Sequence, residues 1–146
     1  MKIIIENLPE GAEEEIVIRC SSMDSGIMEL IYALKAGRSR LTAFDDDGGV
    51  VKLEPNDIYY FESVDNKVYA YCEKNVYEVK QKLYELEEEY SHSDLVRISK
   101  AMIANVSRIN KIVPMFNGRL EAELANGEKV VISRQYVPDL KKKLGI

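Results

Sequence analysis

The chain has 146 residues, of which 46% are hydrophobic, and this is enough to bury one core. A single histidine and two cysteines without CxxC spacing argue against a zinc site or a Ser-His-Asp triad, and no apolar run approaches the roughly 20 residues of a membrane helix. We therefore expect a cytoplasmic protein with no metal, no cofactor and no direct membrane insertion.

Residues 1–45 are expected to form a small N-terminal unit that begins with a strand pair. Isoleucines alternate with period two in residues 3–5 and again in residues 16–18. A polar turn at Pro9-Glu10-Gly11 separates the two runs. Alternation on both sides of a turn is typical of paired strands.

A short amphipathic helix is predicted next. Apolar residues in 27–34 fall at i, i+3, i+4 and i+7, with Asp24 or Ser25 as N-cap and Gly37 as the end. Residues 40–44 can add a strand. The sequence thus predicts a ββα(β) unit over residues 1–45, which we expect to serve in dimerisation or regulation, followed by the main domain over residues 46–146.

The main domain opens with a turn at residues 45–49, whose three aspartates lack the ligand spacing of an EF-hand and predict a solvated turn. Alternating segments then predict strands at 50–53, 58–62, 67–72 and 75–79. Apolar residues at 79, 83, 86 and 90 predict a helix over residues 80–89 with one narrow apolar face. We expect this face to cover the sheet.

The sequence from Asp94 onward is again β-like. Val96 and Ile98 alternate with Arg97 and Ser99, and two Asn-Gly pairs, at 117–118 and 126–127, predict hairpin turns. Residues 133–144 predict a final helix. Pro138 lacks a backbone donor, so we expect this helix to start late or to bend.

The charge is unevenly distributed along the chain. Residues 1–45 carry −3, residues 46–90 carry −7, and residues 91–146 carry +5. A net charge of −5 argues against nucleic-acid binding, because phosphate contacts dominate that affinity. The basic excess in the last segment reverses the argument, since it can form a polarised DNA-binding face.

Residues 50–146 resemble a LytTR-type DNA-binding domain. The resemblance rests on the arginine-bearing strand 95–100, the turn ending in Asn105, the hairpin at Asn126-Gly127, and the Ser133-Arg134 pair that opens the last helix. It implies an α+β, mostly β fold: elongated, with one central helix and a short C-terminal helix. It also implies that loops contact successive grooves of double-stranded DNA.

The resemblance places the DNA contacts at three sites. They correspond to the turn with Asn66 and Lys67, to Ser99 and Lys100, and to Arg134. Lys100 and Arg134 can donate to guanine O6 and N7, and Asn66 can pair with adenine or a phosphate.

Two further residues have expected roles, and one tripeptide differs from the family's common pattern. We expect Arg97 to contact phosphate, and Asn105 to be a buried turn residue rather than a DNA contact. Many members of the family carry His-Arg-Ser where this chain has Ser99-Lys100-Ala101, so the base preference there is expected to differ.

The sequence therefore predicts a transcriptional regulator that binds specific duplex DNA, as a homodimer. Residues 1–45 are too short for a phospho-acceptor receiver domain of roughly 100 or more residues. The alternative is a protein-binding module or anti-regulator on the same scaffold, with a partner protein bound through the N-terminal unit. An enzyme is not expected, and no catalytic residue is assigned, because no phosphate loop or activated nucleophile is present.

Overall fold

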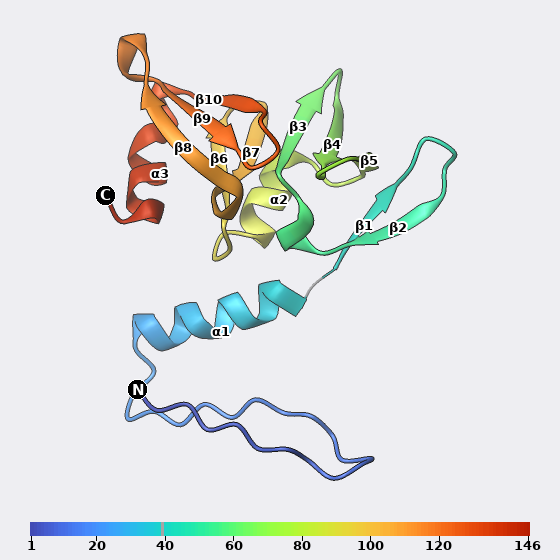
Figure 1. The fold of residues 1–146 in the computed structure, drawn as a ribbon, viewed down its shortest axis with the longest axis vertical. Coiled ribbons are helices and arrows are strands. Elements are labelled where there is room, and N and C mark those ends of the chain that lie inside the picture. Colours follow the sequence, from blue (N-terminus) through green and yellow to red (C-terminus); the bar gives the residue numbers. More distant parts are fainter. Residues whose placement is uncertain (39) are drawn as a thin grey trace.

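The computed structural model describes the backbone of residues 1–38 and 40–146, and strands predominate in it (Figure 1). Within these ranges the α-helices are α1 (Ser25–Arg38), α2 (Leu83–Glu89) and α3 (Val137–Leu144). The strands are β1 (Leu41–Phe44), β2 (Val50–Leu53), β3 (Tyr60–Val64), β4 (Lys67–Tyr71), β5 (Val76–Val79), β6 (Leu95–Ser99), β7 (Met102–Asn105), β8 (Ile109–Pro114), β9 (Leu120–Leu124) and β10 (Lys129–Ile132). The predicted α+β, mostly β fold is confirmed.

The predicted strand pair in residues 1–24 is wrong. The chain does turn there, and the Ala12 N–H donates to the Pro9 carbonyl over 3.1 Å, but neither arm is a strand. Ile3 and Ile5 are 82% and 88% exposed. An isolated two-stranded hairpin is at best marginally stable in water, because alternation yields a strand only where one face is covered.

The predicted first helix is confirmed as α1. The Asp24 carboxylate accepts the Ile27 N–H over 2.9 Å, so Asp24 is the N-cap. The helix ends at Arg38, one residue beyond the predicted Gly37. The ring of Tyr32 stacks on the ring of His92 at 4.0 Å between centroids, so the only histidine of the chain contacts α1.

Seven strands form the larger sheet in the order β2-β1-β5-β4-β3-β7-β6. β1 pairs with β2, with Leu41 opposite Leu53, and with β5, with Phe44 opposite Glu78. Leu41 and Ala43 are buried. The strand that we assigned to the N-terminal unit therefore belongs to the main sheet, because its apolar face is part of the core.

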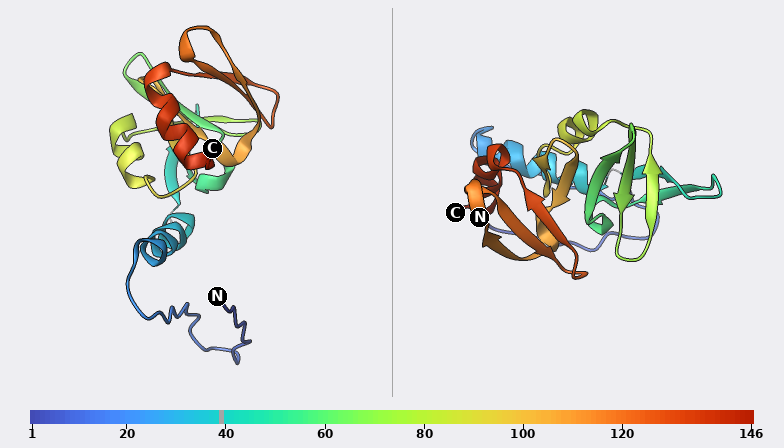
Figure 2. Two further views of the ribbon diagram at one scale, coloured as in Figure 1. Left: turned by 90° about the vertical axis from the view of Figure 1, so that its left-hand side faces the viewer. Right: turned by 90° about the horizontal axis from the view of Figure 1, so that it is seen from above.

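The smaller sheet has the order β10-β9-β8 (Figure 2), and the Ser133 N–H joins it to β6 by donating to the Ile98 carbonyl over 2.8 Å. Both Asn-Gly pairs lie in its hairpin turns, as predicted. The final helix starts late, as expected: a 3₁₀ turn precedes α3, which places Pro138 in the first helical turn, where its missing donor has no cost.

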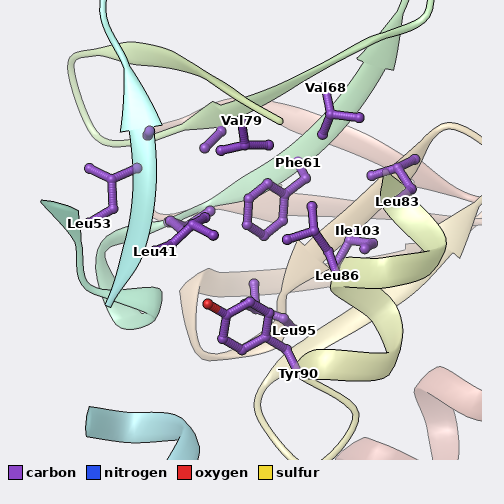
Figure 3. Close-up of a cluster of buried hydrophobic side chains, with 13 residues drawn as sticks. Leu41, Leu53, Phe61, Val68, Val79, Leu83, Leu86, Tyr90, Leu95 and Ile103 are labelled. Carbon is purple, nitrogen blue, oxygen red and sulfur yellow. The ribbon is translucent and has the colours of Figure 1, made fainter. Parts of the chain in front are cut away.

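α2 covers the core of the larger sheet with its apolar face. Figure 3 shows Leu83 and Leu86 of this helix near Phe61 and Ile103, and Tyr90, which follows the helix, beside Leu95; all of these side chains are buried. The prediction that this face covers the sheet is confirmed. The helix begins at Leu83 rather than at Lys80, because the Glu85 carboxylate accepts the Lys82 N–H over 3.1 Å in a capping box.

The two cysteines lie in different environments. Cys20 is exposed, whereas Cys72 packs against the core of the larger sheet, and neither forms a disulfide. Burial raises the pKa of the Cys72 thiol to about 11, so this thiol stays protonated at neutral pH. Cys72 is therefore a structural residue.

None of the three α-helices in the described ranges has the length and apolarity to cross a bilayer.

Candidate nucleic-acid interface

The turn between β3 and β4 presents Asn66 and Lys67. Asp65 and Asn66 both have positive φ angles, of 51° and 63°, which is the geometry of a two-residue type I′ hairpin turn. Asparagine and aspartate tolerate this conformation better than other non-glycine residues. The side chains of Asn66 and Lys67 are exposed at the tip.

The turn between β6 and β7 presents Ser99 and Lys100, and Arg97 fixes its shape. Arg97 Nε donates to the Ser99 carbonyl over 2.7 Å, and one Nη donates to the Lys100 carbonyl. The other Nη is 2.7 Å from the Glu87 carboxylate. The Arg97 side chain is only 18% exposed, so its guanidinium is engaged within the protein while Lys100 faces solvent.

These two turns lie next to each other. β3 pairs with β7, with Glu62 opposite Met102, and the Ser63 N–H donates to the Ala101 carbonyl over 2.8 Å. Both hairpins therefore turn at the same end of the sheet. Lys67 and Lys100, which are 33 positions apart in the sequence, are brought to one surface.

Arg134 joins the same end through the smaller sheet. It follows Ser133, which is bonded to Ile98 only two residues before Lys100. Arg134 also lies against the β8–β9 turn, because a Cβ atom added to Gly118 would come within 3.1 Å of its Cδ. This turn brings the exposed side chain of Arg119 to the same end.

We call this surface the basic rim and define it by six residues of three turns and the start of the last helix: Asn66, Lys67, Ser99, Lys100, Arg119 and Arg134. Figures 1 and 2 show the turns of β3–β4 and β8–β9 at the end of the molecule away from α1. Among the described residues, none of the four rim cations forms an ion pair with a carboxylate. They remain available to phosphates or base edges.

The predicted role of Asn105 is confirmed. This residue is 1% exposed, and its Nδ2 donates to the Ile58 carbonyl over 2.8 Å. Its Oδ1 accepts the Ser107 N–H over 3.1 Å and the Ser107 hydroxyl over 2.6 Å. Asn105 ends β7 at the opposite end of that strand from Lys100, so it satisfies backbone groups away from the basic rim.

Two tyrosines at the opposite end of β3 and β4 from the rim carry no charge at neutral pH. The rings of Tyr60 and Tyr71 stack at 4.3 Å between centroids. Burial, and then the Glu128 carboxylate, raises the pKa of Tyr60, while burial and then Glu62 raise the pKa of Tyr71. Within the described ranges, no three His, Cys, Asp or Glu side chains come together as a metal site.

The sequence analysis missed Arg119 and assigned Arg97 a different role. Asn117-Gly118 predicted a turn, but not that this turn lies at the same end as Lys100. Which hairpin tips share an end depends on the pairing of strands far apart in the sequence. The remaining predicted residues, Asn66, Lys67, Ser99, Lys100 and Arg134, are brought together on one surface.

The chain was compared with protein families and solved structures. The family model described as LytTr DNA-binding domain matches residues 48–145. A solved LytTr DNA-binding domain from Bacillus cereus superimposes with a TM-score of 0.70 at 28% identity, over 75% of this chain and 100% of the other.

Two similar proteins are named as sensory transduction proteins. The sensory transduction protein LytT of Enterococcus faecalis is 28% identical over 114 residues, which cover 78% of this chain and 47% of the relative. LytT of Bacillus anthracis is 33% identical over 97 residues, which cover 66% of this chain and 39% of the relative. The chain thus spans about half or less of these relatives.

A third relative has a similar length. A protein named as an uncharacterized HTH-type transcriptional regulator in Staphylococcus aureus (strain MSSA476) is 26% identical over 147 residues, which cover 100% of this chain and 99% of the relative. In the described part of this chain, strands separate each of the three α-helices from the next. With a family match over residues 48–145, the chain belongs to the LytTr DNA-binding domain family.

Proposed function

We propose that this chain is a transcriptional regulator that recognises specific duplex DNA sequences through the basic rim. One observation carries the proposal: three hairpin turns and the 3₁₀ turn before α3 lie at one end of the molecule and present four cations without carboxylate partners, in a protein whose net charge is −5. Local cations of this kind can bind phosphates even when the whole protein is acidic. Such a regulator acts in the cytoplasm, where bacterial DNA lies.

In this proposal the rim residues have different roles. Arg134 and Lys100 enter the major groove and donate to guanine O6 and N7, and Asn66 pairs with adenine or a phosphate. Lys67 and Ser99 donate to phosphates, which sets the register on the duplex. Arg97 is a positioning residue, because its guanidinium holds the carbonyls of Ser99 and Lys100.

The test is selection from a randomised duplex pool at moderate salt, with wild type and Arg134→Ala compared. We expect an enriched motif for the wild type. Arg134→Ala should cost about 1–3 kcal/mol of binding free energy on the best site and relax the preference at one position.

The matched control for this test is Arg40→Ala. Arg40 is exposed and lies at the start of β1, where it pairs with Glu54, so the control should keep the motif unchanged. If the wild type enriches no motif, the proposal of specific binding fails, and the protein-binding module becomes the better account.

We further propose that residues 1–24 join two copies of the chain. Eight large apolar side chains of this segment are exposed: Met1, Ile3, Ile4, Ile5, Leu8, Ile16, Val17 and Met23. Monomeric proteins seldom expose so much contiguous apolar surface, and the two alternating arms have the pattern of strands that lack a partner. The relative of similar length in S. aureus covers this segment too.

Mass measurement by light scattering tests this second proposal. We expect the wild type to have the mass of two chains, and Ile3→Ser/Ile5→Ser to have the mass of one. Tyr84→Ser removes a side chain of α2 that is 64% exposed, and should leave the mass of two chains unchanged. A wild type with the mass of one chain would contradict the proposal and favour a different partner protein for the N-terminal segment.

A further inference from the structure

The β8–β9 turn holds a phenylalanine out in solvent. Phe116 is 88% exposed, which is unusual for a large apolar side chain, since burial of its ring would be favourable. The turn that carries it is well defined. The Met115 N–H donates to the Arg119 carbonyl over 2.9 Å, and Asn117 and Gly118 adopt positive φ angles of 61° and 73°.

This turn is physically linked to Arg134. A Cβ atom at Gly118 would lie 3.1 Å from Arg134 Cδ, so a side chain at this position would crowd the arginine stem where it lies against the turn. Arg119, which closes the turn, is exposed as well. Phe116 therefore lies on the turn that packs against Arg134, two positions before the glycine in contact with it, so a ligand bound at Arg134 lies close to this turn.

We propose that Phe116 is a further DNA-contacting residue, whose ring packs against the C5-methyl group of a thymine next to the base that Arg134 contacts. The inference rests on the proposed function of the basic rim. The thymine methyl is the apolar group that the major groove displays, and phenylalanine is a suitable partner for it. A ring fixed by a closed turn also loses little conformational freedom on binding.

The two flanking arginines favour DNA over an apolar protein surface as the ligand. A protein interface that buried Phe116 would also have to desolvate Arg119 and Arg134, at a cost that only matching anions offset. A duplex supplies phosphates on both sides of the groove and an apolar methyl within it. Both chemical features of the turn are thus matched by one ligand.

The experiment uses the duplex enriched by the wild type and the same duplex with every thymine replaced by deoxyuridine, which lacks the methyl group. The quantity compared is the ratio of affinity for the thymine duplex to affinity for the deoxyuridine duplex. Loss of the one methyl that contacts Phe116 should contribute about a factor of four to this ratio in the wild type. Phe116→Ala should weaken binding to the thymine duplex, and its ratio should be about fourfold smaller than that of the wild type. Tyr84→Ala, an exposed aromatic on α2, should behave as the wild type.

A fluorescence measurement gives an independent readout. The chain contains no tryptophan, so Phe116→Trp introduces the only tryptophan, whose fluorescence reports on this position. Saturating duplex should shield this fluorophore from acrylamide quenching, whereas the fluorophore of Tyr84→Trp should stay equally accessible.

Failure of the inference differs from failure of the proposed function. If the wild type binds the duplex but Phe116→Ala loses as much as the wild type on replacement, the inference is overturned and DNA binding by the rim stands. Unchanged quenching of Phe116→Trp in the saturated complex overturns it as well. If the wild type binds no duplex, the proposed function itself fails.

Discussion

Asn105→Ala is expected to lower the free energy of unfolding by about 3 kcal/mol. The substitution removes the donor to the Ile58 carbonyl and the acceptor for the backbone N–H of Ser107. A buried polar group left without a partner costs roughly 1–3 kcal/mol, and two backbone groups are affected here. Urea denaturation followed by circular dichroism measures the change, with the slope against urea checked for constancy.

The control for this prediction is Asn56→Ala. Asn56 is exposed and touches the same site only through a 3.3 Å bond between its side-chain oxygen and the Ser107 hydroxyl, so its loss should cost less than about 1 kcal/mol. The folded fraction of Asn105→Ala should bind DNA with wild-type affinity, because Asn105 lies away from the basic rim. Reduced affinity with unchanged stability would instead make Asn105 a DNA contact.

Elements with a clear apolar period could be predicted from the sequence. The spacing of residues 79, 83, 86 and 90 placed one face of α2 on the core, and the capping residue Asp24 marked the start of α1. Asn126-Gly127 marked a hairpin turn, where Gly127 has a φ angle of 88°. These signals are local, so they do not depend on the arrangement of distant strands.

Local alternation failed where no partner covers the strand. Residues 3–5 and 16–18 have the same period of two as β4, yet only β4 has strands on both sides and a core beneath it. The assignment of β1 failed for a related reason: β1 pairs with the adjacent β2, but its other partner β5, which joins this hairpin to the rest of the main sheet, follows 32 residues after β1 ends. Pairing over such a distance leaves no local mark in the sequence.

The candidate site, like the fold, could be predicted only where its features are local in the sequence. The resemblance identified the turns that carry Asn66, Lys100 and Arg134, because each of them lies within a short motif. It could not show that Arg97 forms an ion pair with Glu87, nor that the β8–β9 turn lies against Arg134. Those relations arise from strand order and from a glycine that allows close approach.

DNA binding is expected to weaken about 100-fold when monovalent salt rises from about 50 mM to about 200 mM. If each of the four cations of the basic rim displaces the counterion of one phosphate, whether it contacts that phosphate or a base edge beside it, the slope of log affinity against log salt is about −3.6. Fluorescence anisotropy of the selected duplex over a salt series measures this slope. An acidic protein can show this slope because exposed charges more than roughly 10 Å apart are largely screened at 0.1 M salt. The cations close to the DNA therefore determine the salt dependence of binding.

Single substitutions should divide this slope among the rim residues. Lys67→Ala and Lys100→Ala should each make it less steep by about 0.9, since each removes one cation that displaces a counterion from the duplex. Lys74→Ala is the matched control: Lys74 is also exposed, but it lies in the β4–β5 turn, at the opposite end of β4 from Lys67. A slope that Lys74→Ala lowers and Lys100→Ala leaves intact would place the DNA on the other end of the sheet and contradict the assignment of the basic rim.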